Sequence, residues 1–183
     1  ISQWGHDFRP AYHEIKYLRE LCPKSSLVAL TATATSEVRK DICEKLNMIK
    51  PKLFIDSFFR SNLSYNSILT NDVLSSCIYY LKKSIGSTII YVRSRQSSIE
   101  IAKKLNSKGI ASVFYHGGLD FETKKSVYIN WKENKTRVIV ATNSFGMGID
   151  KADVEKIIHL SIPENLESYF QETGRAGRNG DKS

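Results

Sequence analysis

The sequence is poor in the residues that build disulfide frameworks and metal centres. Its three cysteines, Cys22, Cys43 and Cys77, stand far apart without a C-x-x-C pair, and its four histidines are equally scattered. Such spacing is typical of reduced thiols inside a cell and argues against a disulfide framework or a zinc site. Also absent are a signal peptide and any apolar run near the roughly 20 residues that span a membrane. We therefore expect an intracellular protein that is neither secreted nor embedded in a membrane.

Acidic residues are in the minority, which gives the chain a positive charge. Aspartate and glutamate number 19 against 27 lysines and arginines, so the formal net charge is +8. This excess favours a polyanionic partner, with nucleic acid ahead of a membrane surface. Charge alone is equally consistent with a soluble domain that carries a lysine-rich solvated surface.

From about residue 70 onward, helical and strand-like patterns alternate. Apolar residues at helical spacing run from Val73 to Ile85, Gly109 is suited to end a helix, and Asp120 and Asn165 are suited to begin two others. The predicted strands are Thr88–Val92, Ile110–Tyr115, Arg137–Thr142 and Lys156–Ser161. Buried strands that alternate with amphipathic helices indicate βαβ units. The expected fold is therefore α/β, a parallel sheet flanked by helices.

The first sixty residues follow a different pattern. The elements predicted there are helices at 10–21 and from Ser36 onward, and short strands at 27–30 and 52–58. Two helices and two strands are too few to close a doubly wound sheet. Residues 1–60 are therefore interpreted as the C-terminal end of a first lobe and residues 61–183 as a second lobe. The Ser- and Asn-rich stretch 60–72 is the expected linker.

The segment from Gln171 to Arg178 is rich in groups that bind anions. If it is helical, Gln171, Arg175 and Arg178 are spaced i, i+4 and i+7 and lie on one face. One amide and two guanidinium groups suit an anion such as a triphosphate, and Gly174 and Gly177 would let it approach closely. The alternative is a solvated helix end whose arginines complement the helix dipole.

A second informative segment runs from Val140 to Asp150. A buried strand ends there in a loop of small residues with two glycines and a final aspartate. Ligands of open α/β sheets bind beyond the carboxyl ends of the strands. Thr142 could donate to a phosphate oxygen and Asp150 could accept from a ribose hydroxyl. A turn selected only for its conformation has the same pattern.

These segments resemble the RecQ family of superfamily 2 helicases. The runs ATNSFGMGIDKADV (141–154) and YFQETGRAGRNG (169–180) resemble motifs V and VI. Earlier runs resemble, in the expected order, the aromatic-rich loop (3–12), motif III (30–35), motif IV (89–95) and the segment that follows it (115–119). The sequence departs from the family's usual residues at four positions, Phe59, Gly118, Ala152 and Asn179. None of these departures removes a charged catalytic group.

The resemblance implies that both lobes are RecA-like, with parallel sheets flanked by helices, and that the second lobe holds part of a nucleotide site. Arg178 is implied as the arginine finger, Arg175 as a second γ-phosphate contact and Gln171 as a sensor of the nucleotide. Gly148 and Asp150 are implied to form part of the ATP site. All five residues lie in the two motifs at the C-terminal end of the sequence.

The resemblance also implies a track for DNA and a route that couples it to ATP. The implied DNA backbone contacts are Arg93, Ser94, His116 and Thr142. Trp4, Phe8 and Arg9 are implied to link DNA contact to ATP hydrolysis, and Thr31 and Thr33 to transmit the coupling between lobes. A buried, hydrogen-bonded histidine is an equally good interpretation of His116, and core packing is the alternative for Trp4 and Phe8.

The implied activity is ATP-dependent unwinding of duplex DNA, in the 3′-to-5′ direction, in DNA repair and recombination. The implied ligands are ATP, Mg²⁺ and single-stranded and duplex DNA, and the implied location is the nucleus in a eukaryote and the cytoplasm otherwise. The sequence contains no G-x-x-x-x-G-K-[ST] motif and no adjacent Asp-Glu pair, so the main phosphate and Mg²⁺ ligands are expected upstream and the chain alone is expected to be inactive. The alternatives are a DEAD-box-like RNA helicase and a non-catalytic nucleic-acid-binding module.

Overall fold

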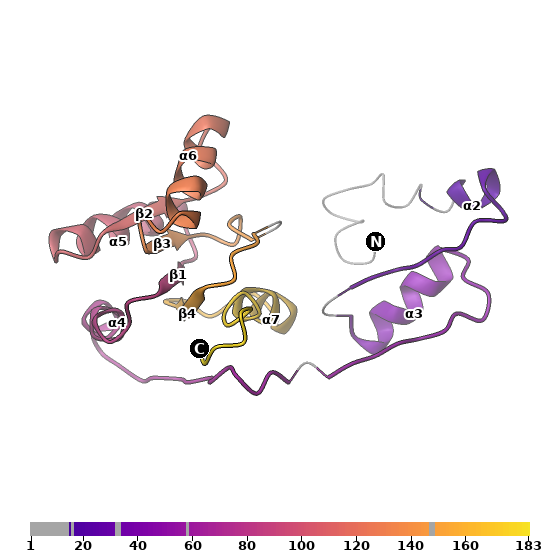
Figure 1. Ribbon diagram of the computed structural model, residues 1–183, viewed down its shortest axis with the longest axis horizontal. Helices are drawn as coiled ribbons and strands as arrows, with labels where there is room; N and C mark the ends of the chain where they lie inside the picture. The colour runs from indigo at the N-terminus through magenta and orange to yellow at the C-terminus, as the bar shows by residue number, and fades with distance from the viewer. Residues whose placement is uncertain (1–14, 16, 32–33, 58, 147–148) are drawn as a thin grey trace. The chain divides into compact units, whose positions relative to one another are not determined.

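The chain folds as two compact units, Ile1–Phe58 and Phe59–Ser183, each of which is considered by itself. The computed structural model describes residues 15, 17–31, 34–57, 59–146 and 149–183 (Figure 1). The sequence places the boundary two residues later, at residue 60. The interpretation of the first unit as the end of another lobe stays a prediction.

The second unit is built around a sheet of four parallel strands in the order β2-β3-β1-β4. The strands are β1 Ser87–Tyr91, β2 Ser112–Tyr115, β3 Val138–Ala141 and β4 Val154–His159. β1 lies at the centre, where Ile90 pairs with Val140 of β3 on one side and with Ile158 of β4 on the other. The parallel sheet is confirmed, but its strands are offset from their predicted limits, and β4 begins and ends two residues earlier than expected.

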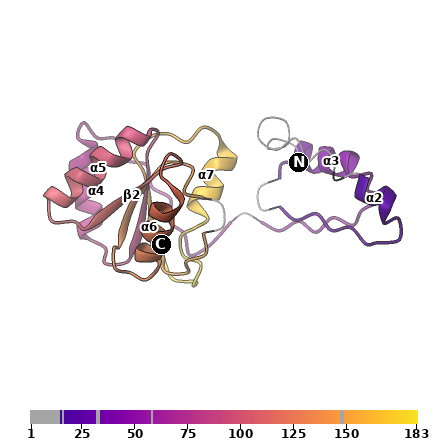
Figure 2. The same cartoon turned by 90° about the horizontal axis from the view of Figure 1, so that it is seen from above.

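Helices cover both faces of this sheet (Figure 2). They are α4 Val73–Lys82, α5 Arg95–Ser107, α6 Phe121–Lys132 and α7 Leu166–Thr173. Because side chains alternate along a strand, Ile90 and Val140 pack against α4 and α5, whereas Ile89 and Ile139 pack against Trp131 of α6. The two apolar layers form the core of the unit, and the predicted α/β fold class is confirmed.

The predicted helix limits hold where a polar residue caps them. Asp120 and Asn165 accept hydrogen bonds from the Thr123 and Ser168 amides, at 2.9 and 2.8 Å, and begin α6 and α7. Hydrogen bonds from Thr123 also hold the pKa of Asp120 below its ordinary value. Gly109 follows α5 with a left-handed φ of +75°, which an L-residue rarely adopts. All three boundary predictions are therefore confirmed.

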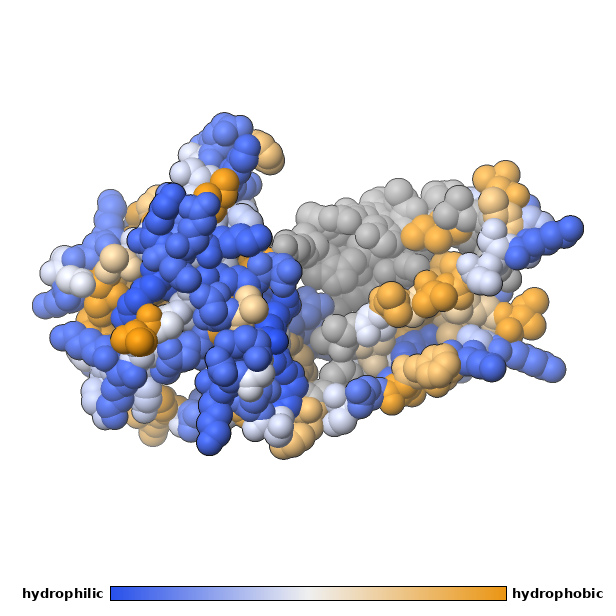
Figure 3. Space-filling model, in the orientation of Figure 1, coloured by the Kyte–Doolittle hydropathy of each residue, from blue (hydrophilic) through white to orange (hydrophobic). Residues whose placement is uncertain are grey.

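The first unit contains two helices within its described part, α2 Tyr17–Leu21 and α3 Ser36–Lys45. Ser36 begins α3 as predicted, while the start of the helix predicted from Pro10 lies outside the described residues. The predicted strands at 27–30 and 52–58 are wrong for the residues described there, which are irregular. A strand requires a hydrogen-bonded neighbour, and no described residue of this unit supplies one. Apolar residues at these positions are consequently exposed, Leu30 at 91% and Phe54 at 93%. Figure 3 shows hydrophobic side chains on the surface of the described part of this unit.

A candidate nucleotide and nucleic-acid site at the carboxyl edge of the sheet

Three adjacent strands of the second unit end at the same edge of the sheet. Tyr91 of β1 and Tyr115 of β2 both pair with Ala141 of β3. The residues that follow these strand ends are Arg93, Ser94, His116 and Thr142. The parallel topology thus brings all four predicted DNA contacts to one edge, where open α/β sheets bind ligands.

These four residues differ in how accessible they are. Arg93 is exposed, whereas Thr142 and His116 are 7% and 8% exposed. The Ser94 hydroxyl caps α5 by accepting the Ser97 amide at 3.0 Å. The Thr142 hydroxyl lies 2.8 Å from that of Ser144. Arg93 is therefore best placed to meet a ligand directly, and the two hydroxyl groups already have local hydrogen bonds.

The surroundings of His116 agree in part with each of the two interpretations drawn from the sequence, a buried histidine and a DNA contact. Its ring stacks on Phe114 with centroids 5.8 Å apart, as expected for a packed histidine. Its Nδ1 nevertheless has no hydrogen-bond partner within the described part of the chain. A buried polar atom without a partner is costly, so this nitrogen is a candidate for contact with a ligand or with water.

Two further cations at this edge were not singled out from the sequence. A Cβ atom added to Gly118 would lie 2.8 Å from Nη1 of Arg95, so this guanidinium packs against the turn after β2. Lys124 donates to the Gly117 carbonyl at 2.7 Å. Arg95 stands two residues after Arg93, and that spacing could have suggested it, whereas nothing in the sequence pattern singles out Lys124.

The loop that follows β3 is held at both ends. Phe145 is buried against the rings of Trp131 and Tyr115, and its carbonyl accepts the Tyr91 hydroxyl at 2.9 Å. Burial raises the pKa of Tyr91, so this hydroxyl keeps its proton. Beyond the loop, the buried Lys151 ammonium donates to the Lys132 carbonyl at 3.0 Å. Gly148 lies outside the described residues, but the loop's anchors fix where Asp150 emerges.

The helical arrangement predicted for Gln171, Arg175 and Arg178 is wrong. α7 ends at Thr173, and Gly177 adopts a left-handed φ of +58°, so the chain turns before Arg178. Gln171 is exposed on α7, Arg175 is buried at 8% exposure, and the Arg178 side chain is 38% exposed. Helical periodicity cannot place residues beyond the end of a helix, and the two glycines of the segment were the signal for that end.

Both arginines nevertheless reach the loop after β3. Nη2 of Arg175 would lie 3.1 Å from a Cβ atom on Gly146, so any larger residue there would require the guanidinium to shift by a few tenths of an ångström. Nε of Arg175 has no partner among the described residues. Nη1 of Arg178 donates to the Ile149 carbonyl at 3.1 Å and lies 3.5 Å from the Asp150 carboxylate, which is 90% exposed. Such an exposed pair is weak, which leaves the Arg178 guanidinium available to a ligand.

A histidine–glutamate pair ties α7 to β4, and the sequence pattern did not reveal it. His159 Nε2 lies 2.7 Å from Glu172 Oε2, and both side chains are largely buried. The His159 ring stacks on Tyr91, with centroids 5.4 Å apart, and tilts against Tyr169. The pair fixes the last turn of α7 and hence the start of the arginine-bearing loop.

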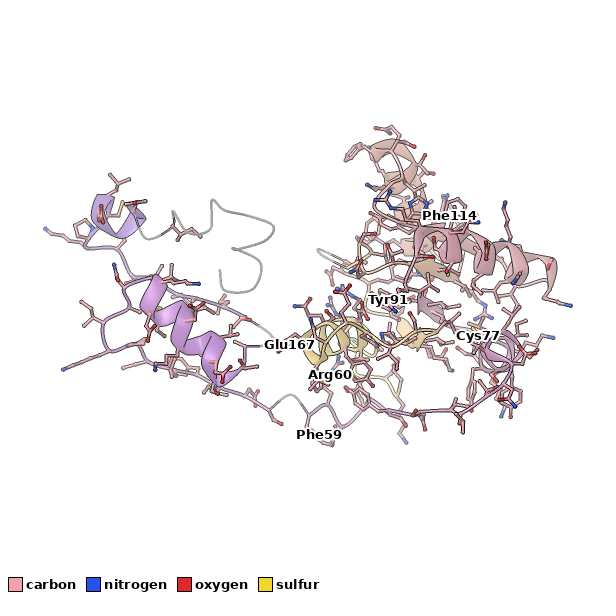
Figure 4. All side chains as sticks on the ribbon, turned by 180° about the vertical axis from the view of Figure 1, so that it is seen from behind. Phe59, Arg60, Cys77, Tyr91, Phe114 and Glu167 are labelled. Carbon is pink, nitrogen blue, oxygen red and sulfur yellow. The ribbon has the colours of Figure 1, made fainter. Side chains whose placement is uncertain are left out.

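The stretch predicted as a linker also contributes to the second unit. Arg60 lies beside the C-terminal segment (Figure 4) and donates to the carbonyl of Ala176 at 2.9 Å, while Asn62 donates to that of Gly177 at 2.8 Å. A run rich in serine and asparagine is ordinarily read as a loop, and no sequence pattern shows which carbonyls such a loop will meet. The first residues of this stretch are therefore part of the folded unit.

The other predicted site residues lie in the first unit. Thr31 is described and exposed, whereas Trp4, Phe8, Arg9 and Thr33 lie outside the described residues. Across the parts of the chain that are described, no three His, Cys, Asp or Glu side chains gather as a metal site. None of the helices seen in those parts has the length and apolar character needed to cross a membrane.

A four-stranded parallel sheet that is flanked by helices, with arginine side chains near its carboxyl edge, gives the second unit the fold of a RecA-like lobe. The chain belongs to the helicase conserved C-terminal domain family, whose pattern matches residues 70–180. Over its full length it is 43% identical to the RecQ-like DNA helicase BLM of Xenopus laevis, and over 97% of its length 41% identical to the ATP-dependent DNA helicase RecQ of Pasteurella multocida. The resemblance to RecQ helicases is thereby confirmed.

The chain spans 14% and 28% of the lengths of these two relatives. Its fold is similar to that of Saccharomyces cerevisiae Dbp5 solved with RNA and ADP BeF3, with a TM-score of 0.75. That match covers 97% of this chain and 48% of Dbp5 at 23% identity. Identity at this level supports the shared fold alone.

Proposed function

We propose that the chain is part of a RecQ-type motor that hydrolyses ATP between two RecA-like lobes and uses it to unwind DNA 3′ to 5′. The observation that carries the proposal is the meeting of Arg175 and Arg178 with the loop after β3. Two guanidinium groups at the carboxyl edge of a parallel sheet are suited to a triphosphate. The high identity to RecQ-type DNA helicases favours DNA over RNA as the substrate.

On the nucleotide side, the residues of this unit supply charge and position. Phosphoryl transfer is catalysed almost entirely by these two effects. Arg178 is proposed to neutralise charge on the γ-phosphate in the transition state, and Arg175, whose Nε has no partner among the described residues, to form a second contact. Gln171 on the exposed side of α7 would sense the nucleotide, and the exposed Asp150 carboxylate would accept from the ribose. ATP supplies the phosphoanhydride bond, and Mg²⁺ ligands are not proposed for this segment.

On the DNA side, the strand-end residues form a sequence-independent track. Phosphate contacts position a nucleic acid without reading its bases. Arg93 is proposed to bind the backbone directly, with Ser94, His116 and Thr142 lining the same edge of the sheet. The +8 net charge of the chain adds a long-range attraction for the strand.

The arginine-finger role is tested by substitution of Arg178 in the complete enzyme. We expect Arg178→Ala to lower DNA-stimulated kcat by about 10³-fold or more, because charge stabilisation in the transition state acts on turnover. Arg178→Lys should recover little, since an ammonium lacks the planar, two-pronged donor. The thermal midpoint should change little, because the side chain is substantially exposed.

The opposite outcome supports the helix-end alternative. Near-normal kcat for Arg178→Ala, together with substantial recovery by lysine and a small loss of stability, would show that Arg178 serves the fold rather than the nucleotide. Steady-state ATPase rates and thermal melts on the three proteins separate these outcomes. DNA affinity serves as the internal control and should stay close to wild type.

The DNA track is tested by the salt dependence of single-strand binding. Each phosphate contact to a single strand contributes roughly 0.7 to the slope of log affinity against log salt. Arg93→Gln should therefore flatten the slope by about that amount. Lys104→Gln is the matched control, because Lys104 is exposed in the last turn of α5, whose first turn lies at the carboxyl edge. Equal slopes for wild type and Arg93→Gln would count against the track.

Unwinding of DNA and RNA duplexes by the complete enzyme distinguishes the two helicase classes. A preference for RNA would favour the DEAD-box-like alternative. Duplex binding without any nucleotide-dependent unwinding would favour the non-catalytic module.

A further inference from the structure

The loop from Gly174 to Asp181 carries both site arginines and is built from turns. α7 ends just before it, and the Arg175 and Ala176 amides donate to the Glu172 and Thr173 carbonyls at 3.3 and 3.1 Å. The left-handed Gly177 then reverses the chain. A Cβ atom at this position would lie 2.5 Å from Nδ2 of Asn62, so the loop is closely packed against residues far away in sequence. The position of the arginines therefore depends on what holds this loop from outside.

Arg60 supplies a large part of that support. One guanidinium nitrogen, Nη1, donates to the Gly174 carbonyl at 3.2 Å and to the Ala176 carbonyl at 2.9 Å. The other, Nη2, donates to the Gly177 carbonyl. A planar, always charged guanidinium is suited to several acceptors at once, and its charge complements the negative end of the α7 dipole. One side chain thus satisfies three carbonyl groups of the loop backbone.

Asn62 and the neighbouring backbone extend the same support. Nδ2 of Asn62 donates to the carbonyls of Gly177 and Asp181, each at 2.8 Å. The Ser64 amide donates to the Ser183 carbonyl at 2.8 Å, and the Ser183 amide donates to the Asn62 carbonyl at 2.9 Å. Residues 60–64 therefore form a clasp along one side of the loop.

The opposite side of the loop is tied to the entrance of β4. The Gly177 amide donates to the Val154 carbonyl at 2.9 Å, and the Asn179 amide donates to the Ala152 carbonyl at 3.2 Å. The loop is thus held between the clasp and the segment that leads from the Asp150 region into β4. Arg178 lies between these two amides in sequence, so a shift of the loop moves its guanidinium relative to Ile149 and Asp150.

We propose that Arg60 is a positioning residue for the ATPase: its guanidinium holds the loop so that Arg175 and Arg178 face the nucleotide. Arg60 does not itself touch the nucleotide, and its effect passes through the three carbonyls it binds. The catalytic part of this inference rests on the proposed function, whereas the clasp itself does not. Misplacement of catalytic groups by about 1 Å can cost on the order of 10²-fold in rate.

Arg137 offers a matched control in the same unit. Its Nη2 donates to the Leu81 carbonyl at the end of α4, at 2.8 Å, so it too joins an arginine to a helix-end carbonyl. Arg137 directly precedes β3 and therefore lies at the edge of the sheet opposite to the site. Loss of Arg137 removes one such hydrogen bond and loss of Arg60 removes three, but only Arg60 supports the arginine-bearing loop.

The experiment compares Arg60→Gln, Arg60→Lys, Arg137→Gln, Arg178→Ala and the Arg60→Gln/Arg178→Ala double variant in the complete enzyme. Below their melting transitions, we expect Arg60→Gln to lower kcat roughly 10- to 100-fold with little change in single-strand affinity. Arg60→Lys should recover only part of the loss, because lysine lacks the fork. Arg137→Gln should lower the thermal midpoint without a comparable loss of kcat. In the Arg178→Ala background, Arg60→Gln should cost less than it does in the wild type, because the part of its effect that passes through Arg178 is gone and only the part through Arg175 remains.

Hydrogen exchange gives a readout that does not depend on turnover. In Arg60→Gln, the amides of Gly177 and Asn179 should exchange at least about tenfold faster, while those of the central strands should be unchanged. Unchanged exchange at these two amides would overturn the clasp. Equal kcat for Arg60→Gln and Arg137→Gln, or additive losses in the double variant, would overturn its positioning role. Wild-type turnover by Arg178→Ala would instead refute the proposed arginine finger, whatever the exchange data show.

Discussion

The two units of this chain handle their apolar residues in opposite ways. In Phe59–Ser183 the sheet is covered on both faces, and Ile89, Ile90 and Trp131 are completely buried. In the described part of Ile1–Phe58 only Ala34 and Leu46 are buried apolar residues. The face drawn in Figure 3 shows hydrophobic side chains along the described residues of this unit. Apolar residues alone therefore do not form a core. They do so in the second unit because helices cover both faces of its sheet.

The two units therefore differ in how much buried apolar surface is available to stabilise them. A sheet with two apolar layers buries enough surface to oppose the entropy of ordering the chain. A pair of short helices with extended apolar segments does not, because short helices gain most of their stability from packing. We infer that the second unit folds on its own residues and that the first is only marginally stable in isolation.

Hydrogen exchange on the 183-residue chain should show the largest contrast. Amides of the central strands 87–91 and 138–141 open only with the whole unit, whereas α3 opens locally. We expect the amides of α3 to exchange at least about 10³-fold faster than those of the strands. Exchange in the strands requires global unfolding, which costs several kcal/mol more than local opening of α3. Similar protection in α3 and in the strands would contradict the comparison.

Removal of buried side chains should have the next largest effect. Leu105 and Leu46 are 0% and 3% exposed and belong to different units. Leu105→Ala should lower the free energy of unfolding of the second unit by about 2–5 kcal/mol. Leu46→Ala should leave this transition unchanged. Denaturant unfolding measures the effect of both substitutions when it is followed by the fluorescence of the buried Trp131 in a Trp4→Phe background. A large effect of Leu46→Ala on this transition would show that the units unfold together.

Helix caps should give the smallest effect. Asn165 caps α7 by accepting the Ser168 amide at 2.8 Å, and Thr35 caps α3 by accepting the Val38 amide at 3.2 Å. Asn165→Ala should cost the second unit about 1 kcal/mol. Thr35→Ala removes an equivalent bond but should change only the helicity of α3, which circular dichroism or local exchange detects. Equal shifts of the Trp131 transition by the two variants would argue against independent units.

The sequence predicted the second unit well because its signals are local. Runs such as Thr88–Val92 and caps such as Asn165 act within a few residues, so a single sequence reveals them. The same reasoning failed for strands at 27–30 and 52–58, since a strand is defined by a neighbour that may be distant in the chain.

The site was predicted in its composition more than in its geometry. Motif resemblance picked out Arg175 and Arg178, but helical spacing placed them on one face, whereas α7 ends at Thr173. The clasp through Arg60 joins residues more than 110 positions apart. No periodicity spans such a distance, so contacts of this kind become visible only in three dimensions.

The central position of β1 also has a consequence for the order in which the chain is made. Both neighbours of β1 in the sheet, β3 and β4, are synthesised long after it. At translation rates of about 5–20 residues per second, Tyr91 waits roughly 2 to 9 s for Val138 and longer for Val154. In that interval the helices α4, α5 and α6 can cover the two faces of β1, but neither of the strands that pair with it exists yet. Both hydrogen-bonding edges of an apolar strand stay open meanwhile, which favours aggregation. The central strand of the finished sheet is therefore the one that waits longest for its partners during translation.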